Sequence, residues 1–132
     1  MSKKVNVLLS AYNGEKYIKA QIDSILNQSY PNVELYVRDD GSKDGTLAIV
    51  REYEEKGLLH LEAGENVGFV KSFEWLIANG GEADYYAFSD QDDVWFEDKI
   101  KMAVEKLEHA REDVPVLYFS NYDFYDLSLI HI

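Results

Sequence analysis

The feature of this sequence that most limits its fold is a regular alternation of short apolar runs with longer segments of helical period. Apolar runs of strand length occupy 5–9, 33–37, 58–61, 85–88 and 117–120. Between them, apolar residues recur every three or four positions, which predicts helices at 15–28, from 44 or 46 to 56, at about 70–79 and at 96–109. Strands that alternate with helices usually pair in parallel, so we expect an α/β domain with a mainly parallel sheet.

The length and composition of the chain fit one domain that covers residues 1–132. Hydrophobic residues make up 46% of the chain and charged residues 29%, which is typical of a globular protein. The spacing of Val70, Phe73 and Ile77 marks the third helix. We find no internal repeat, low-complexity tract or linker that would divide the domain.

The charge balance excludes several classes of partner. Lys and Arg number 13 against 25 Asp and Glu, a net charge of −12, which argues against binding to nucleic acid or to anionic lipid.

The absence of cysteine excludes disulfides, thiolate zinc sites and cysteine nucleophiles. No apolar run approaches the ~20 residues of a membrane span, and no signal-peptide core follows the first residues. We therefore expect a cytoplasmic chain without a membrane span.

Polar clusters follow three of the predicted strands, at Ser10–Asn13, Asp39–Ser42 and Ser89–Asp93. In open parallel sheets, ligands bind beyond the carboxyl ends of the strands, so the carboxylates of these clusters would crowd around one cleft. Like charges at close range need a cation, and oxygen ligands alone favour Mg²⁺ or Mn²⁺. Such an ion takes its remaining ligands from phosphates and water. The sequence therefore predicts a metal-bound diphosphate ligand.

Each of these features also has a plainer interpretation. Either acidic cluster, taken alone, is compatible with an ordinary solvated turn, and only the two together favour a site. Tyr12 fits a core position or a stacking platform for a nucleobase equally well. Lys71 is at a position where a lysine is usually solvated, although it could reach a diphosphate. Asp40–Gly45 opens like a calcium-binding loop, but Arg51 stands where that loop needs a bidentate glutamate.

Five motifs occur in order along the chain: Val5–Asn13, Ser24–Tyr30, Asp39–Thr46, Asn66–Gly68 and Asp90–Trp95. As a set, they resemble the family-2 inverting glycosyltransferases, whose GT-A fold has a Rossmann-like nucleotide-binding half. The Asp-Gln-Asp-Asp-Val-Trp motif is similar to that of bacterial rhamnosyltransferase-like members. The resemblance covers about residues 4–126. It implies transfer of a sugar, with inversion, from a UDP- or dTDP-sugar such as dTDP-rhamnose to a saccharide or lipid-linked saccharide acceptor in polysaccharide synthesis.

The resemblance also implies roles for individual donor-binding residues. Ser10, Ala11 and Tyr12 would line the base pocket, and Glu15 would help to hold the base or the ribose. Asp40 would accept a hydrogen bond from the pyrimidine ring N–H.

Further positions would contact the ribose, the diphosphate and the metal ion. Asp39 is a weaker candidate than Asp40 for the contact with the nucleobase, and Lys71 would lie near the diphosphate. Asp90, Gln91 and Asp92 match the D-x-D motif, which binds ribose and the metal–diphosphate. The ligands of an Mn²⁺ or Mg²⁺ ion would be Asp90, Asp92 and Asp93.

The resemblance places the catalytic base in an acceptor-binding half that follows the fifth strand. The sequence ends before such a half, so we expect a truncated domain, at the inner face of the membrane in a longer parent, and assign no catalytic residue. Two other classes stay open from the residues alone. A sugar-1-phosphate nucleotidyltransferase would carry a glycine-rich basic loop where Tyr12–Glu15 stands, and a receiver-type regulatory module would carry its acid pair after the first strand.

Overall fold

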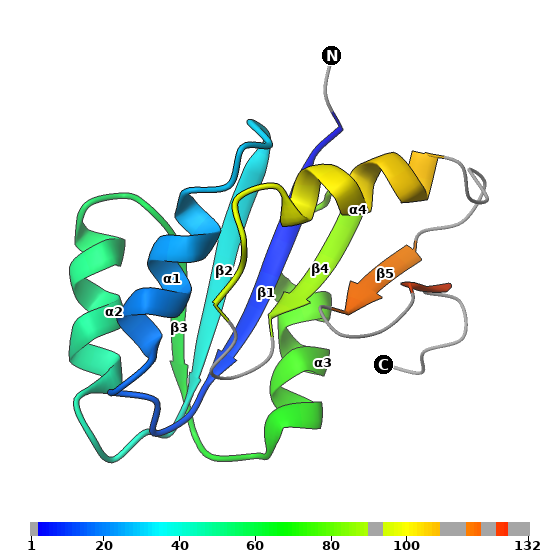
Figure 1. Cartoon of the computed structure of the whole chain (residues 1–132). Helices are drawn as coiled ribbons and strands as arrows, with labels where there is room; N and C mark the ends of the chain where they lie inside the picture. The colour runs from blue at the N-terminus through cyan, green and yellow to red at the C-terminus, as the bar shows by residue number, and fades with distance from the viewer. Residues whose placement is uncertain (1–2, 90–93, 109–115, 120–123, 127–132) are drawn as a thin grey trace.

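The computed structural model of the chain describes residues 3–89, 94–108, 116–119 and 124–126. Strands and helices alternate through most of these residues, as the sequence predicts (Figure 1). In chain order the elements are β1 (Val5–Ala11), α1 (Ile18–Leu26), β2 (Val33–Asp40), α2 (Thr46–Glu55), β3 (His60–Gly64), α3 (Phe69–Asn79), β4 (Tyr85–Ser89), α4 (Lys99–Glu108), β5 (Val116–Phe119) and β6 (Phe124–Asp126).

The described strands form one sheet in the order β3-β2-β1-β4-β5-β6. All neighbours in it are parallel except β6, which pairs antiparallel with β5. The predicted α/β class and mainly parallel sheet are therefore confirmed, whereas the short strand β6 is an addition to the prediction. β1 lies between β2 and β4, with Val5 in register with both Val33 and Tyr85. All seven residues of β1 are buried, as expected for a strand whose two faces are covered.

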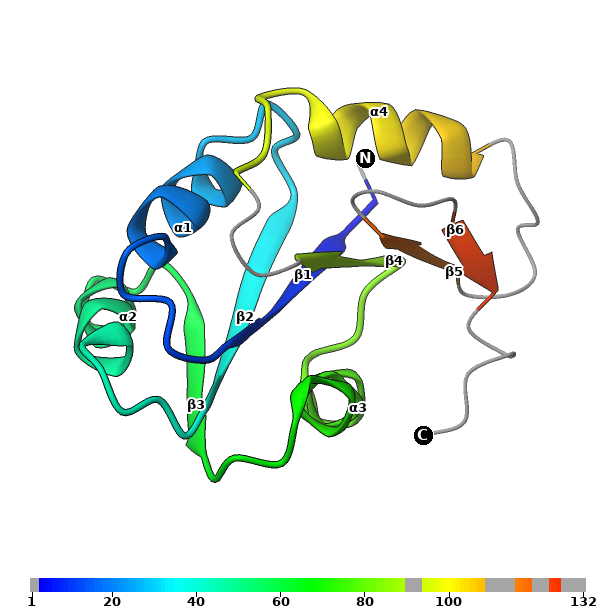
Figure 2. The ribbon, with the colours of Figure 1, turned by 60° about the horizontal axis from the view of Figure 1, so that its bottom comes forward.

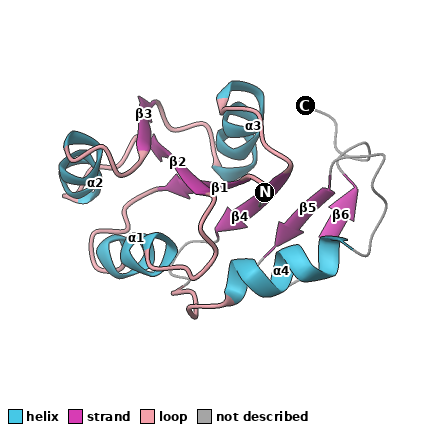
Figure 3. Ribbon diagram, turned by 90° about the horizontal axis from the view of Figure 1, so that it is seen from above, coloured by secondary structure: helices cyan, strands magenta, loops and turns pink. Residues whose placement is uncertain are grey.

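Helices cover both faces of the sheet (Figures 2 and 3). α1, α2 and α4 lie on one face, where Ile22 of α1 and Leu9 of β1 belong to the larger apolar core. α3 lies on the other face, where Leu76 packs with Leu8 and Phe88 in a smaller core. β1 thus contributes alternate side chains to both cores, because successive residues of a strand point to opposite faces.

The inward face of α3 differs in part from the one that apolar spacing suggests: Phe73 and Ile77 pack against the smaller core, whereas Val70 does not. Ser72 and Leu76 are its buried residues, and the ring of Phe73 stacks on Phe88 with 4.7 Å between ring centroids. Val70 is 56% exposed, because it precedes Ser72 by two residues and so lies about 200° away around the helix. A polar residue therefore occupies the centre of the face that meets the sheet.

Several element boundaries also differ from the prediction. β1 continues through Ala11, so the predicted site residues Ser10 and Ala11 belong to the strand, and β3 runs from His60 to Gly64. β2 continues through Asp40, so Asp39 and Asp40 belong to the strand and not to the loop that follows it. α1 begins at Ile18 because Gly14–Tyr17 forms a turn, in which the carbonyl of Gly14 accepts from the N–H groups of Tyr17 and Ile18. Among the helices that the structure describes, none is both long enough and apolar enough to cross a membrane.

Candidate functional site

The order of the strands creates a switch point at the centre of the sheet. The chain places β2 and β3 on one side of β1 and then crosses to place β4 on the other side. In open α/β sheets, ligands bind in the crevice beyond the carboxyl ends of the strands at such a point. β1 ends at Ala11 and β4 at Ser89, which directly precedes residues 90–93. The predicted Asp90, Gln91, Asp92 and Asp93 lie outside the described residues.

The loops that follow β1 and β2 are joined by hydrogen bonds. The backbone N–H of Asn13 donates to Ser42 Oγ over 2.9 Å, and the N–H of Lys43 donates to Asn13 Oδ1 over 2.8 Å. The N–H of Gly14 donates to the buried Thr46 Oγ1 over 2.9 Å. These bonds tie the chain after β1 to the chain after β2, as the sequence-based placement of both clusters at one sheet edge requires.

Asp44 completes this connection. Its carboxylate accepts from the N–H of Thr46 at 3.0 Å and from the N–H of Glu15 at 3.2 Å. The pKa of Asp44 is lowered, chiefly because the Thr46 hydroxyl donates to the carboxylate. The predicted donor residue Glu15 has its backbone fixed in this way, and it is exposed.

Asp39 and Asp40 have different partners because successive residues of β2 point to opposite faces. Asp39 is buried, and its two oxygens accept from the N–H of Ser42 at 3.0 Å and from Ser42 Oγ at 2.6 Å. Both bonds lie within the turn that follows β2. The geometry therefore indicates that Asp39 stabilises this turn. Ser42 of the turn then accepts a hydrogen bond from the N–H of Asn13.

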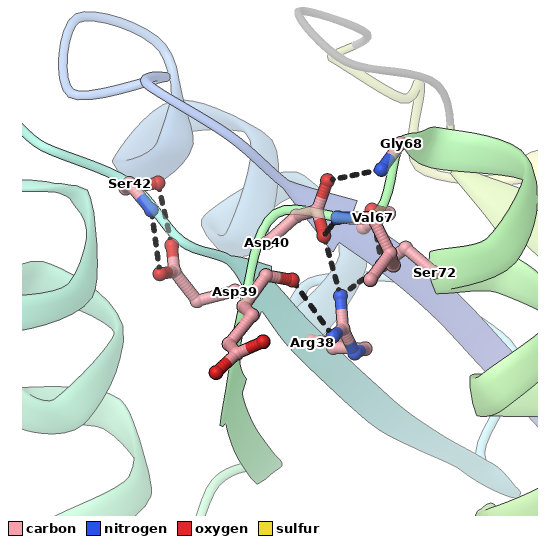
Figure 4. Close-up of polar contacts among 9 residues, drawn as sticks. Arg38, Asp39, Asp40, Ser42, Val67, Gly68 and Ser72 are labelled. Atoms are coloured by element: carbon pink, nitrogen blue, oxygen red, sulfur yellow. Dashed lines mark hydrogen bonds and ion pairs between the residues drawn. The ribbon is translucent and has the colours of Figure 1, made fainter.

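Asp40 lies on the same face of β2 as Arg38 and forms a buried ion pair with it (Figure 4). Arg38 Nη1 lies 2.7 Å from Asp40 Oδ1. The N–H of Val67 donates to the same oxygen at 2.9 Å, and the N–H of Gly68 donates to Oδ2 at 3.1 Å. Gly68 directly precedes α3, so the carboxylate also lies at the positive end of that helix, where a negative charge is stabilised.

Arg38 connects this ion pair to its surroundings. Its Nη1 also donates to Ser72 Oγ at 3.1 Å, and its Nη2 donates to the carbonyl of Glu65 at 3.0 Å. Ser72 in turn accepts from Ser10 Oγ at 2.7 Å. The Nε of Arg38 is buried without a hydrogen-bond partner among the described residues. The result is a buried polar network that joins β1, β2, the segment before α3, and α3 itself.

The other predicted donor-binding residues are distributed around this network. Ser10 and Ala11 are buried, and the hydroxyl of Ser10 points to Ser72 on the α3 side. Tyr12 is partly exposed beyond the end of β1. Lys71 is exposed in the first turn of α3. The structure therefore connects Ser10 to Asp40 through Ser72 and Arg38, and leaves Tyr12 and Lys71 accessible from solvent.

Sequence reasoning missed Arg38, Ser72 and the two backbone donors of the segment before α3. The arginine had a signal, since a charged residue follows the apolar Val37 and lies two residues before Asp40, which is the spacing of neighbours on one face of a strand. Ser72 had none, because an isolated serine in a helix is usually exposed or caps the helix.

Among the described residues, no group of three acidic, histidine or cysteine side chains is placed to hold a metal ion. Asp39 and Asp40 are engaged by Ser42, Arg38 and backbone N–H groups, which does not suit them as metal ligands. A hollow of about 10 Å³ lies beneath α4, beside Ile100 and Val104. It has room for one water molecule at most, so it is not a substrate site.

Comparison with known proteins agrees with this arrangement. The sequence model described as glycosyl transferase family 2 matches residues 6–129. The dTDP-rhamnosyl transferase RfbG of Shigella flexneri is 36% identical over 105 residues, which are 75% of this chain and 36% of that protein. The UDP-Glc:alpha-D-GlcNAc-diphosphoundecaprenol beta-1,3-glucosyltransferase WfgD of Escherichia coli is 31% identical over 121 residues, which are 90% of this chain and 46% of that protein. The chain thus spans less than half the length of these two relatives.

Solved structures give the same result. S. aureus TarS 1-349 in complex with UDP has a TM-score of 0.71 and 31% identity, over 80% of this chain and 32% of that chain. The mannosyltransferase PcManGT from Pyrobaculum calidifontis, in complex with GDP-Man and Mn²⁺, has a TM-score of 0.73 and 27% identity, over 86% of this chain and 34% of that chain. These likenesses confirm the predicted GT-A fold.

Proposed function

Because this chain belongs to glycosyl transferase family 2, we propose that it binds the donor in an enzyme that transfers a sugar from a nucleotide-diphosphate sugar to a saccharide acceptor. The observation that carries this proposal is the meeting of β1, β2 and the start of α3 at the switch point, with Asp40 held there by Arg38 and two backbone N–H groups. Family membership leaves no support for a nucleotidyltransferase or a receiver module.

We assign the nucleoside to the residues around Asp40. The carboxylate of Asp40 accepts a hydrogen bond from the ring N–H of the nucleobase. The partly exposed ring of Tyr12 stacks on the nucleobase. Ser10 and Ala11 form the floor of the base pocket, and Glu15 contacts the base or the ribose. The support for these assignments is the burial of Ser10 and Ala11, together with the loop bonds that hold the chain after β1.

We assign the ribose and diphosphate to the segment after β4, with Asp90 and Gln91 on the ribose and the exposed Lys71 on the diphosphate. A divalent ion, Mn²⁺ or Mg²⁺, would bind there through Asp90, Asp92 and Asp93. Such an ion stabilises the negative charge that builds on the leaving diphosphate. The support is the position of Ser89 at the switch point and the Mn²⁺ bound with GDP-Man in PcManGT.

The finer parts of the proposal concern the sugar, the acceptor and the location. RfbG is named a dTDP-rhamnosyl transferase and WfgD a UDP-Glc-dependent glucosyltransferase, so dTDP-rhamnose is our first candidate donor and a UDP-sugar the second. We propose an inverting reaction on a saccharide or lipid-linked saccharide at the cytoplasmic face of the membrane, in cell-surface polysaccharide synthesis. No residue of this chain is proposed as the catalytic base.

The test is a thermal-shift panel of UDP, dTDP and GDP, each with Mn²⁺, Mg²⁺ or EDTA. A ligand that binds only the folded state stabilises it by about 2.7 kcal/mol at a concentration one hundred times its Kd. We expect a rise in Tm with at least one nucleotide and a divalent ion, and its loss in EDTA. The variant Asp92→Ala should lose the metal-dependent rise, whereas Glu105→Ala, at an exposed position on α4, should keep it. No rise with any nucleotide would refute donor binding, and an equal rise in EDTA would refute metal dependence.

A further inference from the structure

The hydrogen bonds around Asp40 limit what this carboxylate can still accept. A carboxylate has about four acceptor positions, two on each oxygen. On Oδ1, one is taken by Arg38 Nη1 and the other by the N–H of Val67. On Oδ2, the N–H of Gly68 takes one position. Among the described residues, nothing takes the second position on Oδ2, so one acceptor position remains for a ligand; the Asp40 side chain is only 4% exposed.

Arg38 cannot easily break its bond to Asp40 Oδ1, because its guanidinium is held on three sides. Besides Asp40, it donates to Ser72 Oγ and to the carbonyl of Glu65. On the fourth side lies Gly64, where a Cβ atom would overlap Nη2, so the backbone of β3 packs directly against the guanidinium. The side chain of Arg38 is only 7% exposed, and a shift toward solvent would break all of these bonds at once.

The fold alone leaves the identity of the nucleobase open, since similar structures bind UDP and GDP-Man. Resting on the proposed function, we propose that Arg38 is a positioning residue that restricts the donor to a nucleotide of uracil or thymine. These bases present a single imide N–H between two carbonyl groups, which matches a single acceptor position. Guanine presents two parallel N–H donors, which need both oxygens of a carboxylate, and Oδ1 is already occupied. Cytosine presents a ring nitrogen that is itself an acceptor, so a carboxylate repels it.

The ligand side of the proposal is tested by calorimetry on the unmodified chain with Mn²⁺, using UDP, N3-methyl-UDP and GDP. The methyl group removes the imide N–H and leaves the ribose and diphosphate unchanged. We expect UDP to bind at least tenfold more tightly than either of the others. Equal affinity for UDP and N3-methyl-UDP, or for UDP and GDP, would overturn the inference while leaving donor binding intact. Binding of none of the three would instead refute the proposed function.

The protein side is tested with Arg38→Lys, which keeps the charge but cannot serve Asp40, Ser72 and Glu65 together. We expect the ratio of UDP to GDP affinity to fall at least fivefold, with the affinity for inorganic pyrophosphate and Mn²⁺ unchanged. Pyrophosphate separates a loss of base recognition from a general loss of structure. Arg51→Lys, on the exposed side of α2, is the matched control. An unchanged UDP-to-GDP ratio in a folded Arg38→Lys protein would overturn the inference.

If Arg38→Lys does not fold, as judged by circular dichroism, Ser72→Ala takes its place. This variant removes one of the three groups that hold the guanidinium and leaves the ion pair with Asp40 in place. We expect a smaller fall in the UDP-to-GDP ratio, of about threefold, in the same direction. A Ser72→Ala protein with the unmodified ratio would overturn the role of the network.

Discussion

Replacing Arg38 with methionine should destabilise the fold strongly, because it leaves a buried carboxylate without its counter-charge. Methionine keeps most of the apolar stem but removes the donors to Asp40, Ser72 and the carbonyl of Glu65. Arg38 and Asp40 are 6% and 3% exposed, so water replaces little of what is lost. Removing one partner of a buried ion pair costs about 3–5 kcal/mol, and we expect a loss in this range.

Urea denaturation measures this loss. With a slope of about 2 kcal/mol per molar urea, a loss of 4 kcal/mol lowers the midpoint by about 2 M. Arg51→Met, at an exposed position on α2, should change the free energy of unfolding by less than about 0.5 kcal/mol. The double variant Arg38→Met with Asp40→Leu should recover part of the loss, since it leaves no buried charge unpaired. A loss below about 1 kcal/mol for Arg38→Met would refute the reasoning, because the pair would then be effectively solvated.

Two further predictions concern other parts of the fold. Tyr53→Phe removes the hydrogen bond from the Tyr53 hydroxyl to Asp23 at 2.6 Å and should cost about 1 kcal/mol at pH 8 in urea denaturation. Burial, followed by the bond to Asp23, raises the pKa of Tyr53 to about 12, so this contribution is full below about pH 10 and is lost as the pH rises toward 12. The cost of Tyr53→Phe should therefore shrink between pH 10 and 12, and a cost that grows over this range would contradict the assignment. Gly41→Ala should cost about 1–2 kcal/mol in urea denaturation. Gly41 has φ +76°, and a Cβ atom there would lie 2.9 Å from the backbone nitrogen of Asn66. An unchanged midpoint would show that the loop moves to accommodate the methyl group.

The alternation of strands and helices could be predicted from the sequence because burial imposes a different period on each element. Strands covered on both faces, such as β1, appear as continuous apolar runs, and helices covered on one face appear with apolar residues three or four apart. In α3, Phe73 and Ile77 pack against the smaller core as their spacing suggests, but the centre of its inward face could not be predicted in this way. That centre is Ser72, a polar residue that is buried because Arg38 and Ser10 bond to its hydroxyl, and apolar spacing gives no sign of such a residue.

The candidate site was predictable as a place but not as a set of contacts. The carboxyl ends of parallel strands must meet at one edge, so the clusters at Ser10–Asn13 and Asp39–Ser42 could be placed together from the chain alone. The bonds between Asn13, Ser42 and Lys43 depend on the exact conformation of two loops, which the sequence does not fix. Nor does it reveal that the N–H groups of Val67 and Gly68 reach Asp40, since they lie 27 and 28 residues further along the chain.

The pair Asp39–Asp40 shows how much depended on one strand boundary. A strand that ends at 37, as apolar content suggests, makes both acids loop residues with similar roles. Because β2 continues through Asp40, they point to opposite faces, and Asp40 shares a face with Arg38 instead of with its neighbour. Asp39 then accepts a hydrogen bond from Ser42 in the turn after β2, and Asp40 accepts one from Val67 in the segment before α3. The two adjacent carboxylates avoid repulsion through this separation and through Arg38, so the acid pair does not itself require a metal ion. The need for a cation at this edge therefore rests on the acids that follow β4, where Asp92→Ala tests it.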